Sequence, residues 1–146
     1  MVTKKMKIVA LFFIVLMFGS TFAYGIMSLF SQPTNNLQIP QDKILNYELN
    51  EQQRTYLLRN YYTLIEYRYL SGCLECIDMK NELEGITMRS DGQIYLQEIL
   101  SEGSERITIT SLNGEKTIIE PTINETQKAV CNLLLQRPIW CVTSQL

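Results

Sequence analysis

The sequence predicts an α/β domain built on a central mixed sheet, with the element order β-α-β-α-β-β-β-α. Three observations support this prediction. The run Tyr62–Leu70 is rich in apolar, β-branched and aromatic residues, as a central strand should be. Helical patterns precede and follow it, so crossover helices can connect parallel strands. Later, Asn113-Gly114 lies between two apolar-alternating runs and predicts a β-hairpin, which adds antiparallel strands.

The N-terminal segment has the character of a signal anchor or a signal peptide. Residues Ile8–Phe30 carry no charge and follow three lysines. At about 1.5 Å per residue, a helix of this length reaches across a bilayer core. A cleaved signal peptide would instead use Ile8–Phe18 as its apolar region and be cut after Ala23. Because apolar residues resume after Ala23, we expect residues 1–30 to be a single-pass transmembrane helix, with the C-terminal domain on the extracytoplasmic side.

Residues 31–42 are polar, contain two prolines and are predicted to be a linker, which places the folded domain at residues 43–146. After the N-terminal segment the chain has ten basic and fifteen acidic side chains, a net charge of −5 (ten minus fifteen). This charge argues against nucleic acid or an anionic membrane surface as the partner of the domain. The chain has no histidine, which excludes Ser-His-Asp catalysis, Cys-His catalysis and His-ligated metals.

The first half of the domain contains the most clearly marked elements. Ile44–Leu49 alternates like a short edge strand, and Asn50 is a candidate N-cap for a short helix that ends at Asn60. The central strand follows. The next helix begins around Cys76, and we expect it to end near Gly85, a typical C-cap residue.

The second half contains three strands and a helix. These are expected at Gln93–Leu100, Ile107–Leu112, Lys116–Glu120 and Thr126–Gln136. No helix is expected between the first two of these strands, because Ser101–Arg106 is too short and too polar to form one. Thr122 and Glu125 form a capping box at the start of the last helix, and Pro138 is expected to stop that helix.

Cys73 and Cys76 follow the central strand after a short turn and open the next helix, a context typical of a redox-active pair. The N-terminus of a helix supplies unpaired N–H groups and partial positive charge, which stabilise a thiolate at Cys73. Glu75 lies between the two cysteines, and its charge opposes a nearby thiolate. The pair therefore predicts thiol exchange with another protein, or alternatively a static disulfide.

The segment LIEYRYLSGCLEC, Leu64–Cys76, resembles the thioredoxin-like superfamily: an apolar strand with an acidic-aromatic pair, a short loop and a Cys-x-x-Cys that opens a helix. The resemblance covers roughly residues 43–136. It implies thiol–disulfide exchange with a thiol- or disulfide-containing protein partner and no dissociable cofactor. Cys73 matches the nucleophilic cysteine and Cys76 the resolving one. Glu66 matches the acidic residue that the family buries under the disulfide as proton acceptor.

The sequence departs from the family at several positions. The loop between Glu66 and Cys73 is one residue longer than usual, and Gly72 stands where the family has an aromatic residue. Glu105 and Arg106 stand where the family places a cis-proline. One helix of the family core is missing from the second half. In the family, this cis-proline shapes the groove that binds substrate peptides. Because it is absent here, we expect this chain to bind substrate peptides differently.

Cys131 and Cys141 are predicted to form a structural disulfide that clamps the tail to the last helix. Closing a loop of about ten residues adds up to about 2–3 kcal/mol. In an alternative interpretation all four cysteines bind one zinc ion, but Cys131-x9-Cys141 is an unusual half-site and export disfavours zinc. An alternative function also stays open: an exported binding or scaffold domain without catalysis, in which both cysteine pairs are structural disulfides.

Overall fold

The computed structural model describes residues 37–143, so the predicted membrane anchor at residues 1–30 lies outside the described residues. Within the described part, no helix is long and apolar enough to cross a membrane. The described residues from Gln38 onward form one compact unit. The contacts of this unit begin in the predicted linker, where the Gln38 carbonyl accepts a hydrogen bond from Gln53 Nε2 at 2.8 Å.

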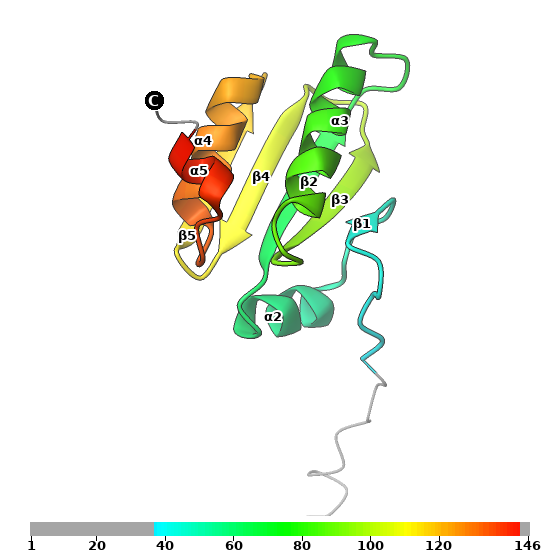
Figure 1. Cartoon of the computed structure of the whole chain (residues 1–146). Coiled ribbons are helices and arrows are strands. Elements are labelled where there is room, and N and C mark those ends of the chain that lie inside the picture. The colour runs from blue at the N-terminus through cyan, green and yellow to red at the C-terminus, as the bar shows by residue number, and fades with distance from the viewer. Residues whose placement is uncertain (1–36, 144–146) are drawn as a thin grey trace, which may run out of the picture. The chain divides into compact units, whose positions relative to one another are not determined.

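Five strands of the described chain form one mixed sheet in the order β1-β3-β2-β4-β5 (Figure 1). They are β1 (Ile44–Leu45), β2 (Thr63–Tyr69), β3 (Ile94–Leu100), β4 (Arg106–Ser111) and β5 (Gly114–Ile119). β1, β3 and β2 run parallel, whereas β4 is antiparallel to β2 and β5 is antiparallel to β4. The predicted mixed α/β sheet is confirmed, including the central position of the apolar run that became β2.

The described helices are α2 (Glu51–Arg59), α3 (Glu75–Met88), α4 (Ile123–Leu133) and α5 (Ile139–Thr143). Asn50 caps α2 in both directions: its side chain accepts from Gln53 N–H, and the Gln53 side chain accepts from Asn50 N–H. Asn60 ends this helix, as predicted. Thr122 caps α4 by accepting a hydrogen bond from Glu125 N–H at 3.3 Å.

The apolar core is divided between the two faces of the sheet, because successive side chains of a strand point to opposite faces. Ile65 and Tyr67 of β2 belong to the larger cluster, which also includes buried residues of α3 and α4. Leu64 belongs to a smaller cluster with Leu57 of α2. Figure 1 shows α3, α4 and α5 in front of the sheet.

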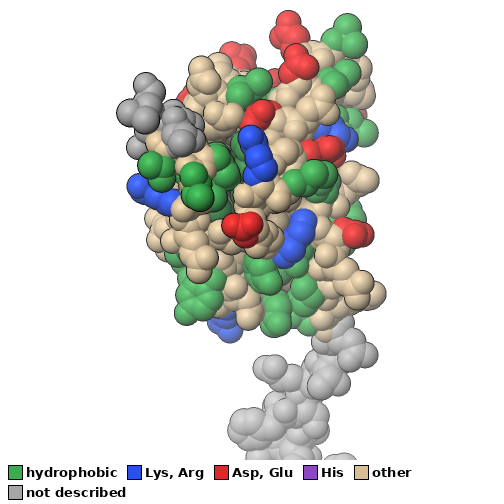
Figure 2. All heavy atoms as spheres, in the orientation of Figure 1, with side chains coloured by type: hydrophobic (Ala, Val, Ile, Leu, Met, Phe, Trp, Pro, Cys, Tyr) green, Lys and Arg blue, Asp and Glu red, His purple; other side chains and the backbone are tan. Residues whose placement is uncertain are grey.

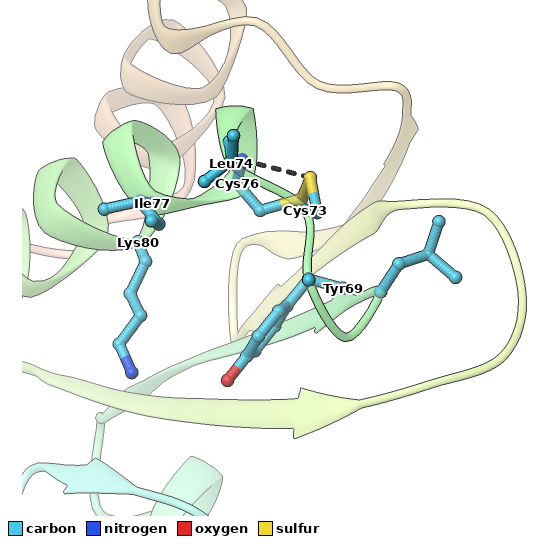
Figure 3. Close-up of a pocket in the computed structure, with 8 residues that line it drawn as sticks. Tyr69, Cys73, Leu74, Cys76, Ile77 and Lys80 are labelled. Atoms are coloured by element: carbon cyan, nitrogen blue, oxygen red, sulfur yellow. Dashed lines mark hydrogen bonds between the residues drawn. A yellow bond between two sulfur atoms is a disulfide. The ribbon is translucent and has the colours of Figure 1, made fainter.

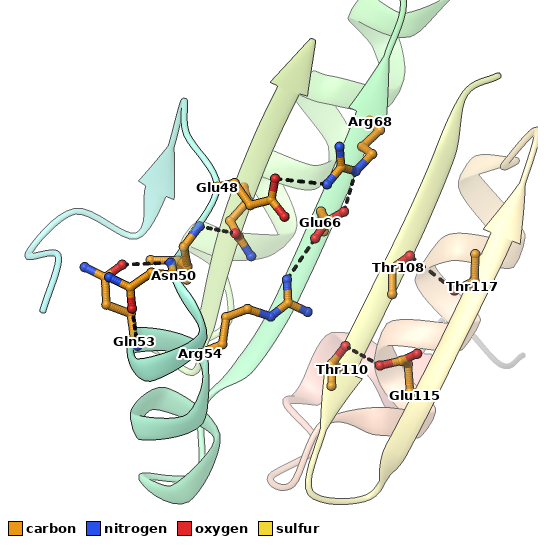
Figure 4. A network of polar contacts seen from close by, with 12 residues as sticks. Glu48, Asn50, Gln53, Arg54, Glu66, Arg68, Thr108, Thr110, Glu115 and Thr117 are labelled. Carbon is orange, nitrogen blue, oxygen red and sulfur yellow. Dashed lines mark hydrogen bonds and ion pairs between the residues drawn. The ribbon is translucent and has the colours of Figure 1, made fainter. Parts of the chain in front are cut away.

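The chain passes from β3 to β4 through residues 101–105 without a helix, as the sequence predicts. β4 alternates accordingly: Ile107 and Ile109 are fully buried, while Thr108 and Thr110 are half-buried on the other face. That face carries polar contacts with β5, including a hydrogen bond between Thr108 and Thr117 (Figure 4). A helix that covered this face of β4 and β5 would need apolar side chains beneath it, but the side chains there are polar.

Two predicted helix ends are wrong. α3 continues through Gly85 to Met88, because Ile86 is fully buried and that packing outweighs the low helix propensity of one glycine. α4 ends at Leu133, well before Pro138, because Leu134 adopts an extended conformation and is itself buried. The tail then forms the short helix α5, which the sequence did not indicate.

Candidate functional site

The first candidate site is a disulfide between Cys73 and Cys76, located just beyond the carboxyl end of β2. The first turn of α3 has no side-chain cap of the usual kind, since Leu74 occupies the N-cap position. Instead, the Cys76 N–H donates a hydrogen bond to Cys73 Sγ at 3.1 Å. After reduction, the same N–H and the positive end of the helix dipole would stabilise a thiolate on Cys73.

The two sulfur-bearing residues differ in exposure. Cys73 is half-buried, whereas Cys76 is only 2% exposed. Gly72, directly before the pair, has a φ of +79°, in the left-handed region that L side chains rarely adopt. A Cβ there would meet nothing within 4 Å, so the requirement for glycine is conformational rather than steric. The sharp turn presents the first cysteine to solvent and tucks the second against the core.

A shallow hollow of about 230 Å³ opens beside the disulfide (Figure 3). Both cysteines line it, together with side chains of β2, the following turn and α3. Most of its surface is apolar, provided by Tyr69, Leu70 and Ile77, and Lys80 lies at one end. A partner that reaches Cys73 through this hollow meets aliphatic and aromatic carbon before it meets charge.

Tyr67 lies on the disulfide side of the sheet and connects three segments. Its hydroxyl donates a hydrogen bond to Glu105 Oε1 at 2.6 Å and lies 3.3 Å from the Cys76 carbonyl oxygen. Its ring stacks on Tyr69, with the ring centroids 5.1 Å apart. Burial, followed by the bond to Glu105, raises the pKa of Tyr67 well above its usual value. The hydroxyl therefore stays protonated and acts as a donor that ties the β3–β4 loop to the first turn of α3.

Glu66 does not lie under the disulfide, so its predicted position is wrong. It belongs to the opposite face of β2 from Tyr67, where Arg54 Nη1 lies 2.9 Å away and Arg68 Nε also donates to it (Figure 4). Burial alone would raise the pKa of Glu66, but the bonds and charges of Arg68 and Arg54 hold it below its usual range. Glu66 is thus a carboxylate paired with two arginines on the face of the sheet opposite the disulfide.

The physical reason for this error is the two-residue period of a strand. A shift of one position moves a side chain to the other face. The loop between Glu66 and Cys73 is one residue longer than the family pattern, and that extra residue puts Tyr67 on the disulfide face instead. Sequence reasoning missed Tyr67 and the partnership with Glu105, although the unusual loop length was the signal that could have found the tyrosine.

Glu98 is a second buried carboxylate on the disulfide side of the sheet. It is the register neighbour of Tyr67 on β3, and its side chain is only 1% exposed. Lys80 of α3 approaches its Oε2 at 2.7 Å. Burial raises the pKa of Glu98, and the charge of nearby Glu84 raises it further, while the lysine opposes both. The ion pair binds the middle of α3 to the end of β3 at the edge of the hollow.

The other two cysteines form a disulfide between α4 and α5, where the sequence predicts a structural bridge. Cys131 and Cys141 are each 2% exposed and belong to the main apolar cluster. Beside the bridge, Trp140 Nε1 donates to the Arg89 carbonyl at 3.3 Å, which links α5 to the end of α3. Nothing in these surroundings gives either sulfur access to solvent.

No protein-family model and no curated protein matches the chain. Among solved structures, it is similar to chloroplastic thioredoxin z, with a TM-score of 0.45 and 17% identity, covering 59% of this chain and 90% of that one. It is also similar to the first thioredoxin domain of mouse protein disulfide-isomerase A4, with a TM-score of 0.42 and 16% identity, covering 70% and 82%. These likenesses are weak. The thioredoxin-like fold of the domain is evident in its own mixed sheet, with a Cys-x-x-Cys at the start of the helix after the central strand.

Proposed function

We propose that this thioredoxin-like domain is a thiol–disulfide oxidoreductase that works through Cys73 and Cys76. The observation that supports the proposal best is the asymmetry of the pair. Cys73 is half-buried at a helix N-terminus and accepts a hydrogen bond from a backbone N–H, whereas Cys76 is buried directly behind it. A nucleophile needs access and a stabilised thiolate, and a resolving thiol needs proximity and protection from other disulfides.

The reaction requires no group beyond the partner's own disulfide. In the reduced protein, the Cys73 thiolate attacks one sulfur of the partner disulfide, and the partner's other sulfur leaves as a thiolate. Cys76 then loses its proton to the partner thiolate released first and attacks Cys73 Sγ in the mixed disulfide, and the partner's second sulfur leaves as a thiolate, which takes a proton from water. The products are the Cys73–Cys76 disulfide and a partner with two thiols, so two electrons have moved to the partner. The reverse sequence oxidises a dithiol.

Tyr67 and Glu105 have a positioning role in this proposal. The hydrogen bond between them fastens the loop before β4 to β2, and the Tyr67 hydroxyl lies close to the Cys76 carbonyl. The turn that carries the cysteines is thereby held against the sheet while the disulfide opens and closes. Glu66 has no part in the reaction, since its carboxylate is committed to two arginines on the other face.

We also propose that residues 1–30 anchor the protein in a membrane, with the domain on the extracytoplasmic side and exported proteins as its substrates. An uncharged run after three lysines supports this orientation. Two disulfides in a domain of this size also suit an oxidising compartment. The test is digestion of intact cells with a protease that cannot cross the membrane. Loss of the domain supports the proposal, and full protection of the domain contradicts it.

The exchange function is tested by a redox titration of the full chain in defined thiol buffers, with alkylation and mass mapping of each cysteine pair. We expect Cys73–Cys76 to open at a midpoint above about −300 mV while Cys131–Cys141 stays closed. If both pairs resist reduction together, the domain is held by two structural disulfides. The oxidoreductase proposal then fails, and a binding or scaffold role takes its place.

A further inference from the structure

The hollow beside the disulfide continues into a second and larger one. The second hollow has a volume of about 550 Å³ and lies against the carboxyl end of β3. Tyr69 and Lys80 line both hollows, so the two are adjacent. Together they form a groove, here called the Tyr69 groove, that runs from Cys73 across Tyr69 to Leu100. A groove of this extent can hold several residues of an extended polypeptide segment.

Exposed aliphatic side chains border the Tyr69 groove. The exposed fractions are 42% for Leu70, 80% for Leu74, 51% for Ile77 and 63% for Leu100. Leu70, Leu74 and Ile77 line the first hollow together with both cysteines, and Leu100 lines the second hollow. Single exposed leucines are ordinary on protein surfaces, but three exposed aliphatic side chains that line one hollow with a reactive disulfide are typical of a docking surface.

Two acidic residues, Glu75 and Asp78, directly follow the lining residues Leu74 and Ile77 in the chain, although neither of them lines the two hollows. Glu75 and Asp78 are exposed on the first turn of α3, and neither takes part in the ion pairs found among residues 37–143. The one lysine in the lining, Lys80, is already engaged by Glu98 at 2.7 Å. Figure 2 shows acidic and hydrophobic side chains next to each other at the top of the view, above the start of α3. A basic segment complements this surface, and an acidic segment is repelled by it.

We propose that the Tyr69 groove binds the exchange partner through a basic polypeptide segment that carries an apolar side chain next to its reacting cysteine. The apolar side chain packs against Leu70 and Ile77, the basic residues face Glu75 and Asp78, and the cysteine meets Cys73 Sγ. The inference rests on the proposed exchange function and adds the substrate class to it. On the β4 side, the loop before β4 also carries a carboxylate, that of Glu105, which accepts a hydrogen bond from Tyr67.

The test uses the full chain and three cystine-linked peptide dimers that differ only beside the cysteine. The first has leucine next to the cysteine and two lysines; the second replaces leucine with serine; the third replaces both lysines with glutamate. Oxidised glutathione is the reference disulfide. We expect kcat/KM for the leucine–lysine peptide to exceed that of the serine peptide by about tenfold, the value of burying one aliphatic side chain. The lysine-over-glutamate preference should shrink as salt is added.

Two variants and one control locate the effect. Ile77→Gln should bring the leucine-over-serine preference close to one, and Glu75→Gln with Asp78→Asn should do the same for the lysine-over-glutamate preference. Because each readout is a ratio between two substrates of one variant, a change in the potential of the disulfide cancels. Met88→Gln is the matched control, since Met88 is 73% exposed on the same helix but outside both linings. It should keep both preferences.

The outcomes distinguish failure of the groove proposal from failure of the proposed thiol–disulfide exchange. Exchange with every disulfide, but without preferences or with preferences that survive Ile77→Gln, overturns the groove and leaves the oxidoreductase standing. If even oxidised glutathione is not exchanged, the oxidoreductase proposal fails. Whether the Tyr69 groove binds the peptides is then tested by direct binding. Peptides with serine in place of cysteine are then titrated onto the oxidised protein. Binding of the leucine–lysine peptide that Ile77→Gln weakens supports the groove, and no binding overturns it.

Discussion

The two disulfides of this domain are the same bond in opposite surroundings. Cys73–Cys76 lies at a helix N-terminus, one residue of the pair is half-buried, and a hollow opens beside it. Cys131–Cys141 joins α4 to α5 with both residues 2% exposed inside the apolar cluster. The comparison teaches that the placement of a disulfide determines its chemistry: solvent access and a charge-stabilising N-terminus favour exchange, whereas complete burial favours permanence.

The largest expected effect comes from removing the Cys73–Cys76 disulfide. Cys73→Ser removes the accessible nucleophile and should abolish exchange with any disulfide, as measured by turnover of oxidised glutathione and of a peptide disulfide. Cys76→Ser should behave differently, because Cys73 can still attack. That variant should accumulate the mixed disulfide, which mass spectrometry detects. Turnover of Cys73→Ser at the rate of the natural protein would show that the reactive sulfur lies elsewhere.

The second expected effect comes from removing the other disulfide. Replacing both Cys131 and Cys141 with alanine should lower the free energy of unfolding by about 2–3 kcal/mol, since the short loop that they close is freed in the unfolded chain. Urea denaturation measures this change. The exchange rate per folded molecule should stay at the value of the natural protein, because neither sulfur reaches the hollow. A loss of exchange in a folded variant would mean that the two disulfides are coupled.

A smaller effect is expected at the hydrogen bond that anchors the reactive turn. Tyr67→Phe removes the donor to Glu105 and should cost about 1.5–3 kcal/mol of stability, because the acceptor is charged. It should also change the midpoint potential of Cys73–Cys76 relative to Cys131–Cys141 in the same titration. Tyr69→Phe is the control, since the described hydrogen bonds include none from its hydroxyl. Equal shifts in both disulfides would indicate a general loosening rather than positioning.

The sequence and the structure agree where local signals and tertiary packing point the same way. The apolar run at β2, the Asn50 cap and the alternation of β4 are each visible in a few adjacent residues, and each is found in the structure. The disagreements need distant information. Gly85 is a stop signal locally, but Ile86 packs into the core, so α3 continues. The face of a strand on which Glu66 lies depends on register, which the strand's own composition does not determine.

Glu66 provides the smallest and most discriminating test, because the disulfide chemistry should not depend on it. Glu66→Gln should leave the exchange rate and its pH dependence unchanged, whereas a proton acceptor for Cys76 would be needed at every turnover. The free energy of unfolding should instead fall by about 1 kcal/mol at neutral pH. The loss is limited because the two arginine partners are partly exposed.

The pH dependence of the free energy of unfolding gives a second test that Glu66 is paired with the two arginines. The folded pKa of Glu66 lies below its unfolded value, so its contribution is complete above the usual carboxyl pKa and is lost as pH falls through the folded value. The natural protein should therefore lose more stability than Glu66→Gln when urea unfolding is compared at neutral pH and at acid pH below about 4. If the exchange rate falls in Glu66→Gln at neutral pH, Glu66 takes part in the disulfide chemistry, and the assignment of Tyr67 rather than Glu66 to the disulfide side of the sheet is wrong.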